Sequence, residues 1–269
     1  MDTQQPAGFW QKNKLVIKAV FIGFLTLALL IPTFFIMFLV NDREKRRDEV
    51  VKEVSNKWAG AQTITGPFLS VPYYVEVKDA SNQSVLQKRN LYLLPDELTI
   101  NGKLMPQIRH RSIFNVPVYN SNLTIEGKFL PLKTGKLPVK IEALHFEEAV
   151  MCLGITDFKG IGENLSLKWN DSTSGFETGL PDISWLNTGI RSPIALSAPA
   201  ATGSMSTFRI NLSLKGSEQL FLTPFGNTSK VHLKSDWSNP AFDGKYLPDT
   251  SILSAKGFTA DWKVLHFNR

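Results

Sequence analysis

Hydrophobic residues form one unbroken run near the N-terminus, and they alternate with polar residues over most of the remaining chain. Between Leu15 and Val40 the sequence carries one charged residue, Lys18, and residues 19–40 carry none. An α-helix over the uncharged residues 19–40, at roughly 1.5 Å per residue, covers about 33 Å, which matches the hydrocarbon core of a bilayer. The run therefore predicts one transmembrane helix over residues 15–40, in which Pro32 is a tolerated kink.

Two alternatives to a spanning helix fit the pattern less well. A cleaved signal peptide has a shorter apolar core and a small-residue cleavage site, whereas this core is long and runs into Asn41-Asp42-Arg43. A buried core helix would show a shorter and one-sided apolar run. Phe9 and Trp10 precede the run and fit an aromatic belt at the membrane interface, which also favours the spanning helix.

The segment after this run is charged and lacks glycine and proline. Val50, Val51, Val54 and Trp58 fall at helical spacing within it. This pattern predicts an amphipathic juxtamembrane helix over residues 41–60 that continues the membrane helix and ends at Gly60.

From residue 61 the period changes from helical to the alternation of a half-buried strand. Phe208, Ile210, Leu212 and Leu214 alternate with polar residues and give the clearest example. Further strands are expected at 69–77, 90–94, 98–104, 112–119, 123–130, 149–154, 165–169 and 258–264, and from Val231. Asn101-Gly102 is a candidate turn, and residues 135–138 and 190–202 are loop-like.

Many short strands with few helical stretches predict a mainly β protein with an antiparallel β-sandwich-like extramembrane domain over residues 61–269. The sequence stops directly after a strand pattern, so we expect this domain to be incomplete at its C-terminal end.

Composition and charge narrow the function classes. The chain is 43% hydrophobic and 20% charged, which is typical of a globular protein rather than a disordered one. Its net charge of +6 comes from basic residues scattered along the chain, without a nucleic-acid-binding motif. We therefore expect no nucleic-acid partner; the excess suits an anionic membrane surface or envelope polymer. The expected partners are the lipid bilayer and other envelope or inner-membrane proteins.

Basic residues flank both ends of the membrane run. Lys12, Lys14 and Lys18 lie on the N-terminal side, and the segment Arg43–Arg47 contributes a comparable cluster on the other. Loop charge therefore does not decide which side carries the domain, and long domains translocate largely regardless of charge.

The residue types that carry chemistry are sparse. The histidines form no HExxH or His-x-His pair, and Cys152, the sole cysteine, lies among apolar neighbours typical of a buried inert thiol. His145-Phe146-Glu147-Glu148 could ligate a cation but is typical of surface carboxylates. The segment Gly154–Gly162 has glycines and one lysine but lacks the closing Lys-Ser/Thr of a phosphate-binding loop at the required spacing, so a turn is favoured. We therefore predict no catalytic, cofactor-binding or metal-binding residues.

Two further hypotheses come from particular residues. Asp157, Glu163 and His110 would be the carboxylates and base of a membrane-anchored hydrolase acting on an envelope polymer, although no spacing implies that they meet. Several aromatic residues could line a glycan-binding face, although core packing is the commoner role: Trp169, Trp185, Trp237, Trp262, Phe225 and Tyr246.

Five motifs occur in an order that resembles one bacterial family. They are Gly66-Pro67-Phe68-Leu69-Ser70-Val71-Pro72; Leu93–Leu98 with Arg109–Ile113; Val118-Tyr119 with Leu123–Phe129; Asp157–Ile161; and Ser235–Phe242 with Leu247-Pro248, ahead of Gly257–Trp262. This series resembles the CreD family of inner-membrane proteins, which is associated with cell envelope integrity.

The resemblance covers nearly the whole chain and implies a topology. It implies that residues 1–14 are cytoplasmic, that the domain lies in the periplasm, and that several C-terminal membrane helices follow in the family but are missing here. It supplies no catalytic residues. The expected function is therefore a non-enzymatic contribution to envelope integrity through a periplasmic binding or docking domain.

Overall fold

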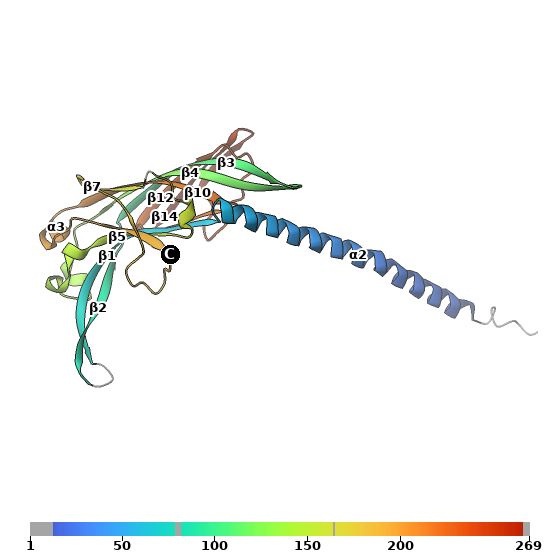
Figure 1. Cartoon of the computed structure of the whole chain (residues 1–269), viewed down its shortest axis with the longest axis horizontal. Coiled ribbons are helices and arrows are strands. Elements are labelled where there is room, and N and C mark those ends of the chain that lie inside the picture. The colour runs from blue at the N-terminus through green and yellow to red at the C-terminus, as the bar shows by residue number, and fades with distance from the viewer. Residues whose placement is uncertain (1–12, 79–81, 164, 266–269) are drawn as a thin grey trace, which may run out of the picture. The chain divides into compact units, whose positions relative to one another are not determined.

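The fold is described from a computed structural model that covers residues 13–78, 82–163 and 165–265. The chain divides into two compact units, Met1–Val51 and Lys52–Arg269. The first is helical, and the second contains two β-sheets (Figure 1). The expected class, mainly β with one N-terminal membrane helix, is confirmed.

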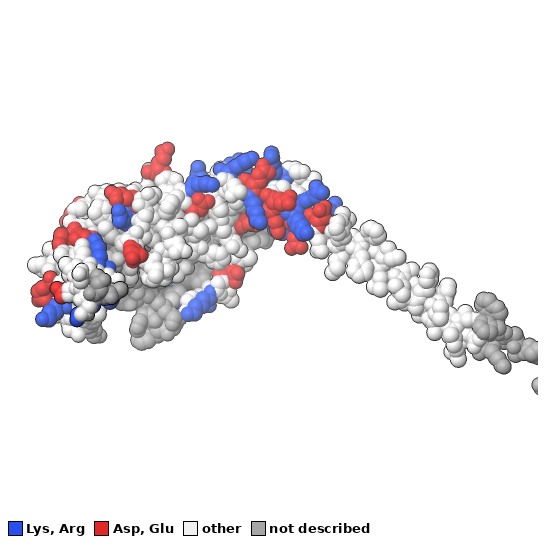
Figure 2. All heavy atoms as spheres, turned by 60° about the horizontal axis from the view of Figure 1, so that its bottom comes forward, with Lys and Arg blue, Asp and Glu red and all other residues white. Residues whose placement is uncertain are grey.

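Helix α2 runs without interruption from Lys14 to Lys57. Among the described residues it is the one helix long and apolar enough to cross a membrane. Its apolar side chains are solvent-exposed, and charged side chains return on its C-terminal part (Figure 2). The membrane helix predicted over 15–40 and the juxtamembrane helix predicted over 41–60 are thus one element, which ends at Lys57 rather than at Gly60. Phe9 and Trp10 lie outside the described residues.

Local hydrogen bonds and ion pairs support α2 along its length. The hydroxyls of Thr26 and Thr33 donate to carbonyl oxygens four residues earlier, which keeps these polar groups satisfied in a lipid environment. In the charged part, Arg46 bonds to Asp42 at 2.9 Å, four residues apart on one face.

The first sheet has six strands, in the order β11-β1-β5-β9-β8, with β2 also paired to β1. Its strands are β1 (Gln62–Lys78), β2 (Ser84–Leu93), β5 (Val150–Ile155), β8 (Glu177–Thr178), β9 (Gly189–Pro193) and β11 (Leu220–Pro224). The short β11 pairs in parallel with the first residues of β1, and β2 pairs with the later residues of the same edge. β11 therefore forms an edge of this sheet.

The second sheet has eight strands, in the order β13-β14-β12-β3-β4-β10-β6-β7. Its strands are β3 (Glu97–Arg111), β4 (Phe114–Phe129), β6 (Ser166–Trp169), β7 (Ser172–Ser174), β10 (Ser206–Ser217), β12 (Thr228–Ser235), β13 (Thr250–Ser254) and β14 (Gly257–Leu265). β3 and β12 pair in parallel, as β1 and β11 do in the first sheet, so both sheets are mixed rather than purely antiparallel.

Short helical turns connect these strands. They are the 3₁₀ turns η1 (Thr134–Lys136), η2 (Ile141–Ala143), η3 (Phe146–Glu148) and η4 (Phe158–Gly160), and helix α3 (Ala198–Gly203). The turn expected over Gly154–Gly162 is confirmed, because η4 lies between β5 and β6. The loop expected over 190–202 instead contains most of β9 and much of α3, and Ser197 caps α3 by accepting a hydrogen bond from the Ala200 amide.

Two sequence interpretations of β3 and β4 were wrong. Asn101-Gly102 is not a turn: both residues lie inside β3 and pair with β4 and β12. A side chain at Gly102 would collide with Leu123 and Leu233, so glycine is required here for close packing. The strands expected at 112–119 and 123–130 form the single strand β4. The polar residues Asn120–Asn122 between them stay in the strand because they pair with both β3 and β10.

The core lies between the two sheets. The first sheet contributes residues such as Ile64, Met151 and Leu153, and the second contributes residues such as Ile125 and Leu212, each at most 2% exposed. Both inner faces follow the alternation of the sequence, as in β10, where every second residue from Phe208 to Leu214 is buried.

A buried glutamine joins the start of β1 to two distant segments. The Gln62 side-chain amide donates to the carbonyls of Asp157 and Lys215 at 2.9 and 3.0 Å, and its oxygen accepts from the Asp157 amide at 3.2 Å. The Asp157 carboxylate accepts in turn from the Gly60 amide at 3.0 Å. We call Gln62, Asp157, Gly60 and Lys215 the Gln62 junction.

The end of α2 is fixed beside this junction within the second unit. Trp58 lies under two cations, with the Arg109 guanidinium 4.7 Å and the Lys215 ammonium 5.2 Å from its ring centroid. Arg111 also pairs with Glu53 at 2.8 Å, and hydrogen bonds from Lys57 and Arg111 lower the pKa of this carboxyl. The last turn of the helix is thereby held to β3 and β10.

Replacing Gln62 by leucine tests the junction. Gln62→Leu leaves the Asp157 amide and two carbonyls without their side-chain partner, so we expect the free energy of unfolding to fall by about 2–4 kcal/mol. Urea unfolding of the full chain in detergent measures this. Gln107→Leu, at an exposed position on β3, is the matched control and should change stability by less than about 0.5 kcal/mol. Equal effects of the two variants would contradict the role of the junction.

Candidate functional site

A cavity of about 1010 Å³ lies between the two sheets on the side of β11. One wall is formed by β11, and the opposite wall by β3, β4, β12 and β14 of the second sheet. A segment without regular structure, residues 236–249, crosses from β12 to β13 and also lines the cavity. We call this segment the strap.

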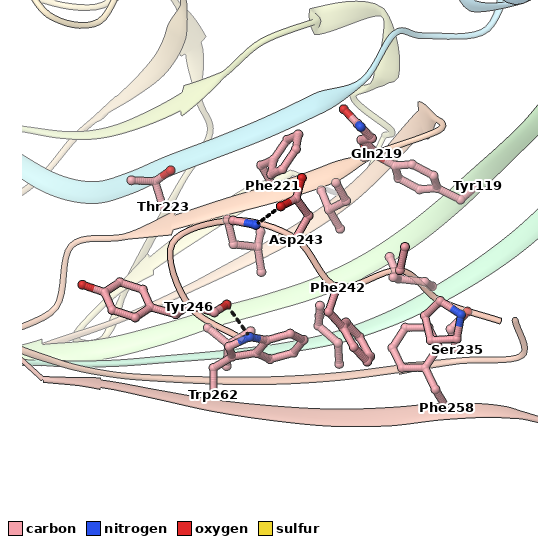
Figure 3. A pocket seen from close by; sticks show the side chains of 18 of the residues that line it. Tyr119, Gln219, Phe221, Thr223, Ser235, Phe242, Asp243, Tyr246, Phe258 and Trp262 are labelled. Carbon is pink, nitrogen blue, oxygen red and sulfur yellow. Dashed lines mark hydrogen bonds between the residues drawn. The ribbon is translucent and has the colours of Figure 1, made fainter. Parts of the chain in front are cut away.

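Most side chains that line the cavity are apolar or aromatic. In Figure 3 the strap passes between β11 and the rings of Phe258 and Trp262 of β14. Leu220 and Leu222 of β11 pack toward the inter-sheet core, whereas Phe221 and Thr223 point away from these rings. Phe242 of the strap contacts both aromatic rings of β14, at centroid distances of 5.5 Å to Phe258 and 5.7 Å to Trp262. These edge-on contacts hold the strap against the wall of the second sheet.

Hydrogen bonds attach the strap at both ends. The Trp237 amide donates to the Ser235 hydroxyl of β12 at 3.2 Å, and the Trp262 indole of β14 donates to the Tyr246 carbonyl at 3.2 Å. The Asp249 carboxylate accepts from the Lys263 amide at 2.6 Å. The middle of the strap, around Phe242, is therefore positioned by ring packing, while its ends are tied to β12 and β14.

The polar groups of the cavity differ in their hydrogen-bond partners. The Tyr119 hydroxyl donates to the Gln219 carbonyl at 2.8 Å, and burial raises the pKa of this phenol. The Asp243 carboxylate accepts from the next amide, at Gly244. The Tyr246 hydroxyl is buried and has no hydrogen-bond partner among the described residues, while Lys245 lies 5.3 Å above its ring. An unpaired buried hydroxyl is a group that a water or a bound molecule would satisfy.

Some of the aromatic residues that the sequence suggested for a glycan-binding face line the cavity. Phe225, Trp237, Tyr246 and Trp262 line it. Trp169 is instead a core residue, 3% exposed, and Trp185 packs on Phe225 from outside the lining at 5.7 Å.

The cavity is also lined by four aromatic residues that the sequence did not single out as binding candidates: Tyr119, Phe221, Phe242 and Phe258. The signal for β11 was the apolar run Leu220-Phe221-Leu222, which is short enough for a buried or edge strand.

The residues considered for hydrolysis make separate contacts. His110 lies near the β3–β4 turn and its Nδ1 is 2.7 Å from the Asn115 side-chain oxygen. Asp157 belongs to the Gln62 junction, and Glu163 is exposed on the connection to β6. No contact joins these three within the part of the chain that the structure describes.

The acidic segment at η3 forms a small exposed cluster. The ligand atoms of His145, Glu147 and Glu148 lie within 4.8 Å of one another. His145 bonds to Glu147 at 2.9 Å, and Glu148 pairs with Lys88 at 2.7 Å. Lys88 already neutralises one of these carboxylates, and their exposure agrees with the surface carboxylates expected from the sequence.

A second hollow, on the outer face of the second sheet, is lined by charged groups from β3, β4 and β10. Arg209 pairs there with Glu126 at 2.7 Å, and Lys128 pairs with Glu97 at 2.8 Å. These four charges are therefore matched within the chain, in contrast to the apolar lining of the inter-sheet cavity.

The chain is similar to known membrane proteins over most of its length. The family model described as "Inner membrane protein CreD" matches residues 14–269. Inner membrane protein CreD of Escherichia coli strain K12 is 27% identical over 249 residues, which cover 90% of this chain and 53% of that protein. The chain thus spans about half the length of the curated relative it matches.

Solved structures give only a distant likeness. An M1 zinc metallopeptidase from Deinococcus radiodurans aligns with a TM-score of 0.30 and 8% identity, covering 63% of this chain and 38% of that one. A mutant of the same enzyme bound to a Tyr-Ser-Ala substrate aligns with a TM-score of 0.29 and 9% identity over the same shares. No functional argument rests on a likeness this weak.

The single thiol gives a test of core packing beside this site. Cys152 is fully buried on β5, and burial raises the pKa of its thiol to about 12. At pH 8 only about one thiol in ten thousand would be ionised, so the folded chain should not react with a maleimide over an hour, whereas the unfolded chain should react within minutes. Mass spectrometry before and after urea treatment measures this. Rapid labelling of the folded chain would contradict the packing around β5.

Proposed function

The chain belongs to the CreD family of inner membrane proteins, and on that premise we propose that it contributes to cell envelope integrity by binding rather than by catalysis. In this proposal α2 spans the inner membrane and the β-rich domain lies in the periplasm. The domain binds an apolar ligand in the inter-sheet cavity. Its partners are the lipid bilayer and other envelope proteins.

The observation that carries the proposal is the inter-sheet cavity itself. Its volume of about 1010 Å³ is at the upper end of the range of ligand pockets, and apolar side chains, several of them aromatic, make up most of its walls. Lining residues such as Thr223 and Ala241 are exposed, so the space is accessible from solvent, and a large accessible apolar pocket with a few polar groups is the usual form of a ligand site.

The polar groups of the cavity favour binding over catalysis. General acid–base chemistry needs a titratable group that is within hydrogen-bond reach of the proton it moves. Asp243 bonds to a backbone amide and Lys245 lies over an aromatic ring, so the charged groups of the strap already have other contacts. A few polar groups in an apolar pocket are typical of sites that orient a ligand.

Labelling of introduced cysteines tests the periplasmic placement. Thr173→Cys lies on the exposed strand β7, and Lys14→Cys at the start of α2 reports the opposite side of the membrane. An impermeant maleimide should label Thr173→Cys once the outer membrane is opened, and Lys14→Cys only after the inner membrane is also opened. The native Cys152 is the buried internal control. The reverse order of labelling would place the domain in the cytoplasm.

A charge placed in the cavity tests binding. Phe242→Asp puts a carboxylate among Phe258 and Trp262, and should weaken binding of a polarity-sensitive naphthalene dye by at least about tenfold, because a buried charge is costly. Leu247→Asp is the matched control: it lies on the same strap, is 68% exposed and does not line the cavity. Dye fluorescence with the full chain in nanodiscs measures both. If neither variant changed dye binding, the cavity would not be the binding site.

A further inference from the structure

We infer that the ligand of the inter-sheet cavity is an extended apolar peptide segment, which adds as a further strand to the free edge of β11. This inference rests on the proposed binding function and names the ligand class. It concerns the unpaired main-chain N–H and C=O groups at this edge of β11, which contacts with apolar side chains alone would not satisfy.

The first observation is that β11 faces the cavity along its whole length. Eight consecutive residues, 218–225, line it. Successive side chains of a strand point to opposite faces, so one face of a strand exposes only every second residue. A continuous stretch of lining residues therefore means that the cavity runs along the edge of β11, where its backbone is accessible.

The second observation is which backbone groups point to that edge. In the parallel pair with β1, the Gln62 amide donates to the Gln219 carbonyl, and Leu220 lies opposite Gln62. In this register Phe221 and Thr223 direct their N–H and C=O groups toward β1, whereas Leu220 and Leu222 direct theirs away. No other strand pairs with that edge within the residues that the structure describes.

These unpaired groups distinguish a peptide from a lipid. β11 is only half-buried, so solvent reaches these groups in the free chain, and a ligand that displaces this solvent without replacing its hydrogen bonds loses free energy. An acyl chain would fill the apolar space but would leave the N–H and C=O groups of Leu220 and Leu222 without partners. An extended peptide would satisfy them while placing apolar side chains against the aromatic wall, which is the mode of strand addition at a sheet edge.

The dimensions also fit a short segment. β11 has five residues and ends at Pro224, which at about 3.3 Å per residue corresponds to an added strand of roughly five residues. Phe242 and Trp262, whose rings contact each other edge-on, lie on the opposite side of the cavity from β11. Alternate apolar side chains of a bound strand would pack against these rings, and their neighbours would point away from them.

Backbone methylation of a peptide tests the inference directly. The probe is a capped heptapeptide with alternating leucine and threonine between terminal lysines, added to the full chain in phospholipid nanodiscs. Two matched versions carry N-methyl groups on the odd or on the even amides. Only one of these sets can face β11, so we expect one version to bind at least about tenfold more weakly than the parent and the other to bind within about threefold of it.

A protein variant gives an independent arm. Leu222→Pro removes one outward N–H and places the proline ring at the edge, so it should abolish binding of the parent peptide. If Leu222→Pro does not fold, the methylated peptides still decide the question with the native chain.

The other outcomes separate the two proposals. Equal binding of both methylated peptides, or binding of oleate without binding of the parent peptide, would overturn strand addition while leaving the cavity a binding site for lipid. Failure of the peptide, oleate and the naphthalene dye alike would overturn the proposed binding function as well.

Discussion

The architecture depends on one buried side-chain amide. Gln62 stands where the chain leaves its helix and enters the first sheet, and its three hydrogen bonds join that point to the turn after β5 and to the end of β10. Because the amide is fully buried, it has no water to replace these partners. The same residue also pairs through its backbone with Gln219, directly before β11. The position of β11, and therefore of the cavity wall, follows from this junction.

This arrangement also places the cavity next to the end of α2. The Ser55 hydroxyl lies 2.7 Å from that of Ser217, and Ser217 precedes the turn that starts β11. Tyr119 lines the cavity and holds the same turn through the Gln219 carbonyl. A change at the cavity and a change at the last turn of the helix therefore act on the same short segment, residues 217–220.

The sequence predicted the elements with a strong local signal. The uncharged run of residues 19–40 and the alternation at 208–215 are set by hydrophobic period alone, and both appear in the structure as expected. Asn101-Gly102 was misread as a turn because its glycine serves packing against Leu123 and Leu233, which is a tertiary constraint without a local signature. The cavity could not be predicted for the same reason. Its walls come from β3, β11 and β14, and their proximity depends on parallel pairings between segments more than 100 residues apart.

The central claim is that the outer edge of β11 is unpaired and borders a binding cavity. Residue-level amide hydrogen exchange of the full chain in nanodiscs tests it most directly. The account predicts alternation within one strand: Leu220 and Leu222 exchange fast and Phe221 and Thr223 slowly, and the first pair becomes protected when the apolar heptapeptide is added. Uniform protection of all four amides in the free chain, or no change on adding peptide, would contradict it.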